Sequence, residues 1–277
     1  MNYLLLLLWL RLSGAPTSPP LVPLQIAEQF VAATAWPAMK DYLCCEVASQ
    51  AKSQTLGQQI PARLRRTCQL VQQGPATAVV AVELGDSVSR RDFYLHFSKE
   101  NDGWKLRAIR NLAMTHLGPP MVNLLTALPP AEVADYDRKH PDARHAFTVG
   151  NLRLWTSADA DLMAHFEKHR AEFEALRRLV QAGRYFDTPA AGPDDAGEQA
   201  ANAAPAVHAL LRQLYLARVS RRETGCASCL EFVIGGKVNS TVGLLYQPQP
   251  AQLPSMEPNR LIVLRSLGNG WYLYKTT

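Results

Sequence analysis

Two histidines at helical spacing are the first candidates for chemistry in this chain. His165 and His169 are four residues apart, a spacing that lets two imidazoles on one helix share a metal ion. A helical zinc peptidase carries Glu directly after the first His, and this chain has Phe166 there. His169 also falls in the same apolar stripe as Leu162 and Phe173, with His165 at its edge. We therefore favour packed histidines over a metal site, and we expect no metal or cofactor.

A row of polar residues alternates along the predicted strand 90–99. Asp92, Tyr94 and His96 share one parity of this strand. The apolar residues of the other parity are Phe93, Leu95 and Phe97. A half-buried strand turns its apolar side to the core, so we expect the polar row to face outward, as a contact face for a subunit or partner protein. This parity disfavours an enzyme, which needs its acid–base groups inside a dry pocket.

The last predicted strand carries a second candidate contact face. Tyr272 and Tyr274 are separated by one residue, so both point to the same side of a strand over 271–275. This side is either a partner surface or part of a well-packed terminal strand.

The chain has five cysteines, and this odd number leaves at least one free or paired between chains. Cys226 and Cys229 form a C-x-x-C that runs directly into a strand, so the pair lacks the helix N-terminus that stabilises a redox thiolate. It also lacks a second ligand pair for zinc. A small disulfide or two inert thiols are the remaining interpretations. Cys44 and Cys45 are adjacent on a predicted helix, and one of them could pair with Cys68.

Composition and charge exclude several classes of protein. The formal net charge of +5 is spread along the chain in separate small clusters, so we expect no nucleic-acid partner. No apolar run approaches the ~20 residues of a membrane helix, so we expect no stable membrane insertion. Residues 4–10 are apolar and are followed by small residues, which is typical of a signal segment within residues 1–20. That segment indicates a periplasmic or secreted protein; without export the chain would be cytoplasmic.

The order of predicted elements indicates an α+β protein of two small domains, each with leading helices packed on an antiparallel meander. The first domain spans residues 21–115, a proline-rich connector spans 116–150, and the second domain spans 151–277 with a mobile loop over 188–205. The predicted helices are 26–36, 37–52, 60–73, 156–181 and 206–219. The predicted strands are 76–84, 90–99, 104–112, 229–234, 241–246, 261–266 and 271–275.

Residues 22–112 resemble the nuclear transport factor 2-like cone fold, a group that includes ketosteroid isomerases and polyketide cyclases. The likeness rests on the leading helices, the long strands and the closing hairpin Asp102-Gly103-Trp104-Lys105-Leu106. It implies a pocket between the helices and the sheet. An isomerase would need a carboxylate base in that pocket, and Glu28 and Asp41 are the helix candidates for it.

The second half resembles a group of small exported bacterial proteins that have no established activity. The likeness rests on residues 161–173, which include Asp161 and His165, and on Gly270-Trp271-Tyr272-Leu273-Tyr274.

Proteins that resemble both halves occur among bacterial immunity proteins, which neutralise secreted toxins. The resemblance therefore implies a non-enzymatic interaction protein whose partner is a toxin or an envelope protein, with a homodimer as a further option. The alternatives are a small-ligand-binding protein and an isomerase or cyclase. A cavity of several hundred Å³ lined by Phe and Leu would favour the ligand-binding alternative.

Overall fold

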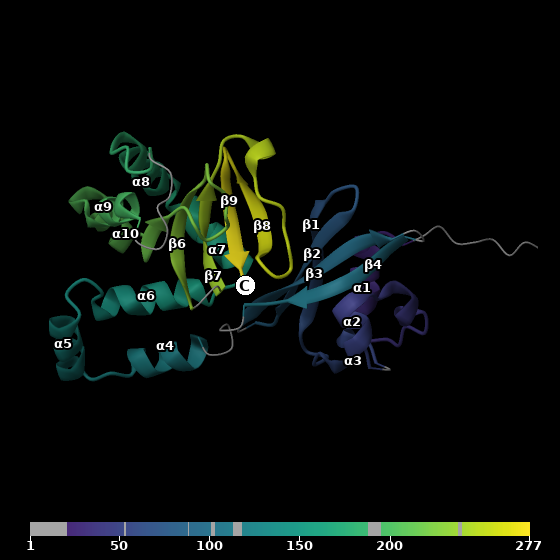
Figure 1. Cartoon of the computed structure of the whole chain (residues 1–277). Coiled ribbons are helices and arrows are strands. Elements are labelled where there is room, and N and C mark those ends of the chain that lie inside the picture. The colour runs from purple at the N-terminus through teal and green to yellow at the C-terminus, as the bar shows by residue number, and fades with distance from the viewer. Residues whose placement is uncertain are drawn as a thin grey trace, which may run out of the picture.

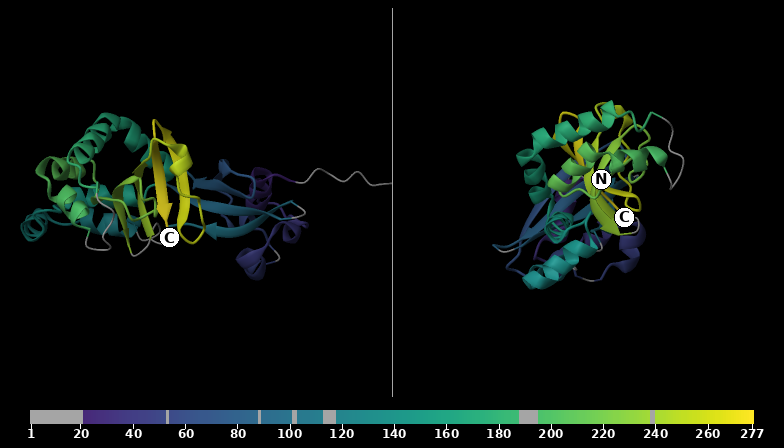
Figure 2. Two further views of the ribbon diagram at one scale, coloured as in Figure 1. Left: turned by 45° about the horizontal axis from the view of Figure 1, so that its top comes forward. Right: turned by 90° about the vertical axis from the view of Figure 1, so that its left-hand side faces the viewer.

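The structure, a computed structural model, describes residues 21–52, 54–87, 89–100, 103–112, 118–187, 195–237 and 240–277. The predicted signal segment within residues 1–20 lies outside these ranges. The described residues form two lobes, each with its own antiparallel sheet, as both Figure 1 and Figure 2 show. This arrangement confirms the α+β class. No helix in the described ranges is long and apolar enough to cross a membrane.

The N-terminal lobe is a four-stranded sheet with short helices on one face (Figure 1). Its strands pair in sequence order, as predicted for a meander. Its helices are α1 (Pro23–Val31), the 3-10 helix η1 (Met39–Tyr42), α2 (Cys45–Gln50) and α3 (Leu56–Gln59). Its strands are β1 (Arg65–Gln73), β2 (Thr77–Gly85), β3 (Arg90–Glu100) and β4 (Gly103–Arg110).

Strand parity places the core of this lobe where the sequence predicts it. Leu95 and Phe97 of β3 are fully buried against the helices, together with Ile26 and Phe30 of α1. Across the strand pair, Leu95 lies opposite Val80 of β2, which belongs to the same cluster. The apolar side of β3 therefore faces the helices, and its polar side faces away from them.

The predicted helix over residues 60–73 is wrong, because most of it is the edge strand β1. Leu64, Cys68 and Val71 match a helical spacing, but pairing with β2 determines the conformation. An edge strand buries few side chains, and a register shift near Leu70 leaves that residue 38% exposed. The alternation of apolar and polar residues that identifies a strand is therefore weak in this segment.

The described part of the predicted connector, residues 118–150, contains two helices and the first half of a third. They are α4 (Gly118–Thr126), α5 (Pro130–Lys139) and α6 (His145–Trp155). The prolines Pro119, Pro120 and Pro130 fall in the first turns of α4 and α5, where the missing N–H costs no helical hydrogen bond. The proline-rich composition of this segment is therefore compatible with helices. Figure 1 shows α4 and α6 side by side beneath the C-terminal lobe.

The C-terminal lobe is a five-stranded antiparallel sheet, and all four strands predicted in it are present. Its helices are α7 (Asp159–Lys168), α8 (Arg170–Ala182), α9 (Ala196–Ala203), α10 (Pro205–Gln213) and the 3-10 helix η2 (Pro250–Gln252). Its strands are β5 (Arg218–Ser220), β6 (Leu230–Lys237), β7 (Ser240–Tyr246), β8 (Leu261–Gly268) and β9 (Trp271–Thr276). The single predicted helix over 156–181 is divided at His169, and α9 lies inside the predicted loop 188–205, of which 188–194 are outside the described residues.

The strand order of this lobe, β5-β6-β7-β9-β8, differs from the predicted meander. The last strand, β9, inserts between β7 and β8. The β8–β9 turn occurs where Gly268-Asn269-Gly270 predicts it, and all three residues have positive φ angles, which glycine adopts without strain. This tight turn lets β9 reverse and pair with β7, which makes β9 an interior strand.

The lobes contact each other through the sides of their sheets that their own helices leave uncovered. On the helical side of the second sheet, Phe166, Phe173 and Trp271 form the centre of one apolar core. A separate cluster joins Val79 and Ala81 of β2 to residues of the C-terminal lobe. The C-terminal members of this cluster include Leu245, Leu261, Val263 and Tyr274. The chain ends at this junction, as Figures 1 and 2 show.

Candidate functional site

The polar row of β3 lies against the C-terminal lobe and not on an outer surface. Tyr94 is fully buried, His96 is 2% exposed, and the side chain of Asp92 is 3% exposed. The Tyr94 hydroxyl donates to Asp159 Oδ1 at 2.8 Å, and the backbone N–H of Asp159 donates to Asp92 Oδ2 at 2.6 Å. The side of β3 predicted to contact a partner contacts the second lobe of the same chain.

Asp159, at the start of α7, is the centre of a buried group of charges between the lobes. Its carboxylate lies 2.7 Å from Lys275 Nζ of β9 and 2.7 Å from Arg265 Nη1 of β8. We call Asp92, Tyr94, Asp159, Arg265 and Lys275 the interlobe charge cluster. Burial by itself would raise the pKa of Asp159, but the charges of Lys275 and Arg265 outweigh it and hold that pKa below its ordinary value.

Tyr272 and Tyr274 are also at the lobe junction. Tyr274 is fully buried, and Tyr272 packs against the same apolar cluster with part of its surface exposed. The prediction of an external partner face is therefore wrong for Asp92, Tyr94, His96 and Tyr274, and for partly exposed Tyr272 it stays a prediction. The physical reason is that strand parity shows which side chains share a face, but it does not show what covers that face.

The side chain of His96 is buried, and its imidazole is hard to protonate. Burial, followed by the nearby charges of Arg110 and Arg107, lowers the pKa of His96 to about 4. The imidazole is therefore neutral near pH 7. The carboxylate of Asp159 is already bound to Tyr94, Lys275 and Arg265, which suits a structural contact better than acid–base catalysis.

A cavity of about 320 Å³ lies between the helices and β4 of the N-terminal lobe. Its apolar lining comes from α1, η1, the residue that follows η1, α2, α3 and β4: Phe30, Met39, Leu43, Val47, Leu56 and Ile109. Its polar lining comes mainly from α2 and the segment that follows it: Glu46, Gln50, Lys52, Gln54, Gln59 and Arg110.

Glu46 and Arg110 form a bidentate ion pair at this cavity, with one N–O distance of 3.0 Å. Hydrogen bonds from Arg110 lower the pKa of Glu46, so this carboxylate is ionised and not poised as a base. Arg110 also donates to the carbonyl of Pro258 at 2.8 Å and to Asn259 Oδ1 at 2.7 Å. One guanidinium thus connects the cavity to a loop of the C-terminal lobe.

The two carboxylates expected in an isomerase pocket are not in the cavity. Glu28 and Asp41 are exposed, and neither lines it. Their assignment as candidate bases is wrong. Sequence reasoning missed Glu46 and Arg110 because they are 64 residues apart, and no local pattern relates them.

His165 and His169 pack against each other and against apolar side chains. Their ring centres are 4.8 Å apart, and His165 Nε2 lies 3.3 Å from the carbonyl oxygen of Leu214. Burial, then the charge of His169, lowers the pKa of His165. Glu172 Oε1 lies 3.8 Å from His169 Nδ1, but His165, His169 and Glu172 do not bring their ligand atoms within 4.8 Å of one another. This is the packed arrangement that the sequence favours.

The cysteines divide into one bonded pair and three free thiols. Cys226 and Cys229 form a disulfide, which is one of the two interpretations that the sequence leaves open. Cys44, Cys45 and Cys68 are free, so the alternative in which Cys68 pairs with one of the adjacent cysteines is not realised. Burial raises the pKa of Cys68 to about 11, which makes its thiol unreactive near neutral pH.

Two features of the described residues are candidates for function: the mixed apolar and polar cavity of the N-terminal lobe, and the adjacent free thiols of Cys44 and Cys45. The interlobe charge cluster is internal and satisfied by its own members. No family model, curated protein or solved structure matches this chain, so the case for a function rests on the geometry of these residues.

Proposed function

We propose that this chain is a non-enzymatic binding protein whose N-terminal lobe holds a small, largely apolar molecule with one polar, anionic end. The cavity between α1, α2, α3 and β4 is the observation that carries this proposal. Its volume of about 320 Å³ is at the small end of the range of ligand pockets, which is roughly 300–1,000 Å³. The inner side chains, Phe30, Leu43 and Val47, suit an apolar body.

The polar lining supports an anionic end on the ligand. Glu46 is neutralised by Arg110, so the ion pair presents little net charge to a bound molecule. Lys52 adds a positive charge, and the glutamines Gln50, Gln54 and Gln59 offer amide donors. A carboxylate or sulfonate at this rim would meet a cation and several N–H groups. An apolar body with such an end fits the two sides of the cavity.

The same residues argue against catalysis. General acid–base chemistry uses a carboxylate whose pKa lies near the working pH, and Glu46 has a lowered pKa and a bidentate partner. We therefore favour binding without turnover. A toxin or envelope protein as partner stays a prediction, and four of the five residues chosen for it, all except Tyr272, have buried side chains.

Binding of anilinonaphthalene sulfonate tests the proposal, because this dye combines apolar rings with one sulfonate and fluoresces in apolar sites. We expect one saturable site per chain. Val47→Phe fills the cavity and should abolish that site, while the far-UV circular dichroism stays unchanged. Lys52→Gln should weaken binding roughly two- to fivefold, as expected for one partly solvated charge.

The matched control is Leu124→Ser on α4, outside the cavity. Leu124 is 68% exposed and lies next to exposed Met121, so this patch is the obvious competing site for an apolar dye. Dye binding that survives Val47→Phe and disappears with Leu124→Ser would contradict the proposal. Absence of saturable binding to the full chain would contradict it as well.

A further inference from the structure

The adjacent cysteines Cys44 and Cys45 bring their thiols together beside a carboxylate. Their Sγ atoms are 2.8 Å apart, and the side chain of Glu100, at the end of β3, completes a group of three. The ligand atoms of all three residues lie within 4.8 Å of one another. This group is separate from the ligand cavity, whose lining includes none of the three.

The backbone explains why two neighbouring side chains converge. Successive residues of a regular helix point about 100° apart. Here Cys44 is extended, with φ −140° and ψ 178°, and Cys45 has a left-handed φ of 56°. A left-handed conformation costs a residue other than glycine roughly 1–2 kcal/mol. The Cys44 N–H donates to the carbonyl of Leu106 at 3.0 Å, so strand β4 anchors this turn.

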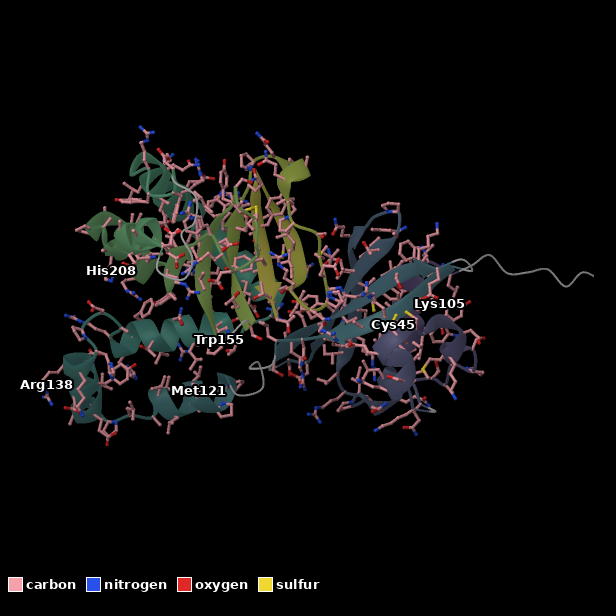
Figure 3. The ribbon with its side chains drawn as sticks, in the orientation of Figure 1. Cys45, Lys105, Met121, Arg138, Trp155 and His208 are labelled. Carbon is pink, nitrogen blue, oxygen red and sulfur yellow. A yellow bond between two sulfur atoms is a disulfide. The ribbon has the colours of Figure 1, made fainter. Side chains whose placement is uncertain are left out.

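The surroundings leave the thiols both oriented and accessible. Ser98 Oγ lies 3.7 Å from Cys44 Sγ, a contact that orients this thiol from the neighbouring strand. Cys45 and Glu100 are exposed, so solvent reaches the group from outside. Figure 3 shows Cys45 on the helical layer of the N-terminal lobe, away from the C-terminal lobe.

We infer that Cys44, Cys45 and Glu100 form a binding site for a thiophilic divalent cation such as Zn²⁺. Thiolates and carboxylates are both ligands of this ion, and solvent would occupy the fourth position of a tetrahedral site. Burial, then the hydrogen bond with Cys45, raises the pKa of the Cys44 thiol to about 12, so the cation must displace this proton. Binding releases both thiol protons to solvent and needs no oxidant or reductant. Zn–S bonds of ~2.3 Å separate two tetrahedral sulfurs by roughly 3.7 Å, so a small outward rotation of exposed Cys45 is sufficient.

Cadmium titration of the full chain tests this inference, because Cd²⁺ bound to thiolate gives an ultraviolet charge-transfer band. The protein is first treated with a chelator and a phosphine reductant. The titration is run in the Cys226→Ser/Cys229→Ser background, which removes the thiols of the reduced disulfide. We expect one equivalent of Cd²⁺, and competition by Zn²⁺ measured with a chromophoric chelator.

Three variants and one control identify the ligands. Cys44→Ser and Cys45→Ser should each remove the charge-transfer band and weaken binding at least a hundredfold, and Glu100→Gln should weaken it roughly tenfold. Cys68→Ser is the matched control, because it removes the third free thiol without touching the group, and it should leave both readouts unchanged. Circular dichroism of each variant checks that the chain folds.

Three outcomes would overturn the inference. One is a reduced chain that shows no charge-transfer band. Another is a band that persists when either Cys44 or Cys45 is replaced by Ser. The third is a peptide containing a Cys44–Cys45 disulfide, two hydrogens lighter than the dithiol by mass spectrometry, together with no metal uptake after reduction. That result would identify a redox pair instead.

Discussion

At the scale of single residues, Asp159 balances two cations that are buried between the lobes. Its side chain is 1% exposed, and those of Lys275 and Arg265 are 3% and 13% exposed. Asp159→Asn keeps the shape but removes the charge. Because it leaves two buried cations undercompensated, we expect the free energy of unfolding to fall by about 3–5 kcal/mol, measured by urea denaturation at pH 7.

Asp161→Asn is the matched control for this prediction, since it makes the same change two residues further along α7. Asp161 forms an ion pair with Arg90, and both side chains are more than 40% exposed. Exposed pairs contribute less than about 1 kcal/mol, so this variant should stay close to the wild type. Equal decreases in the free energy of unfolding of the two variants would show that burial does not determine how much Asp159 contributes to stability.

At the scale of elements, the strands were more predictable than the helices. Alternation and turn residues are local signals, so β2, β3, β4 and the β8–β9 hairpin lie where the sequence predicts them. The segment that forms α9 reads as a loop from its Ala, Gly, Asp and Pro content. Asp195 caps α9 by accepting from the Glu198 N–H at 3.1 Å, and Asp followed by Glu three residues later is a signal that could have located this helix.

The candidate site was less predictable than the elements, because its residues are joined by tertiary contacts. The Cys226–Cys229 pair is encoded locally, and its spacing marked it as a disulfide candidate, with two inert thiols as the alternative. The partners of Asp159 are Tyr94, 65 residues away, and Arg265, 106 residues away. Strand parity identified Tyr94 as a member of the polar side of β3, but only the packing of the second lobe turns that side into a buried contact.

The disulfide between Cys226 and Cys229 closes a short loop that leads into β6, so its effect belongs to this element. A loop of four residues limits the entropy that the bond removes from the unfolded chain to about 2 kcal/mol. We expect Cys226→Ser/Cys229→Ser to lower the free energy of unfolding by that amount. A phosphine reductant should lower the wild type to the same value and leave the double variant unchanged. If the reductant also lowered the free energy of unfolding of the double variant, another thiol would be responsible for that decrease.

At the scale of the whole molecule, the contact between the lobes contains two groups whose pKa values are shifted in opposite directions. Burial, then the charge of Asp159, raises the pKa of Asp92 from 3.8 to about 6, against an opposing effect of Lys275. Protonated Asp92 therefore favours the folded chain, and its contribution is present below about pH 4 and is lost as the pH rises through 6. Neutral His96, with a pKa of about 4, stabilises the folded chain above pH 6.5, and this stabilisation is lost as the pH falls through 4.

These two effects oppose each other between pH 4 and pH 6.5, so the wild-type profile alone does not separate them. The difference in the free energy of unfolding between Asp92→Asn and the wild type does separate them. His96 is present in both proteins, so its contribution cancels in that difference. Asn keeps an oxygen that can accept from the Asp159 N–H but does not titrate. We expect the free energy of unfolding of the variant, relative to wild type, to rise by about 2 kcal/mol from pH 4 to pH 7. A difference that is constant with pH would show that Asp92 ionises between the lobes as readily as it does in water.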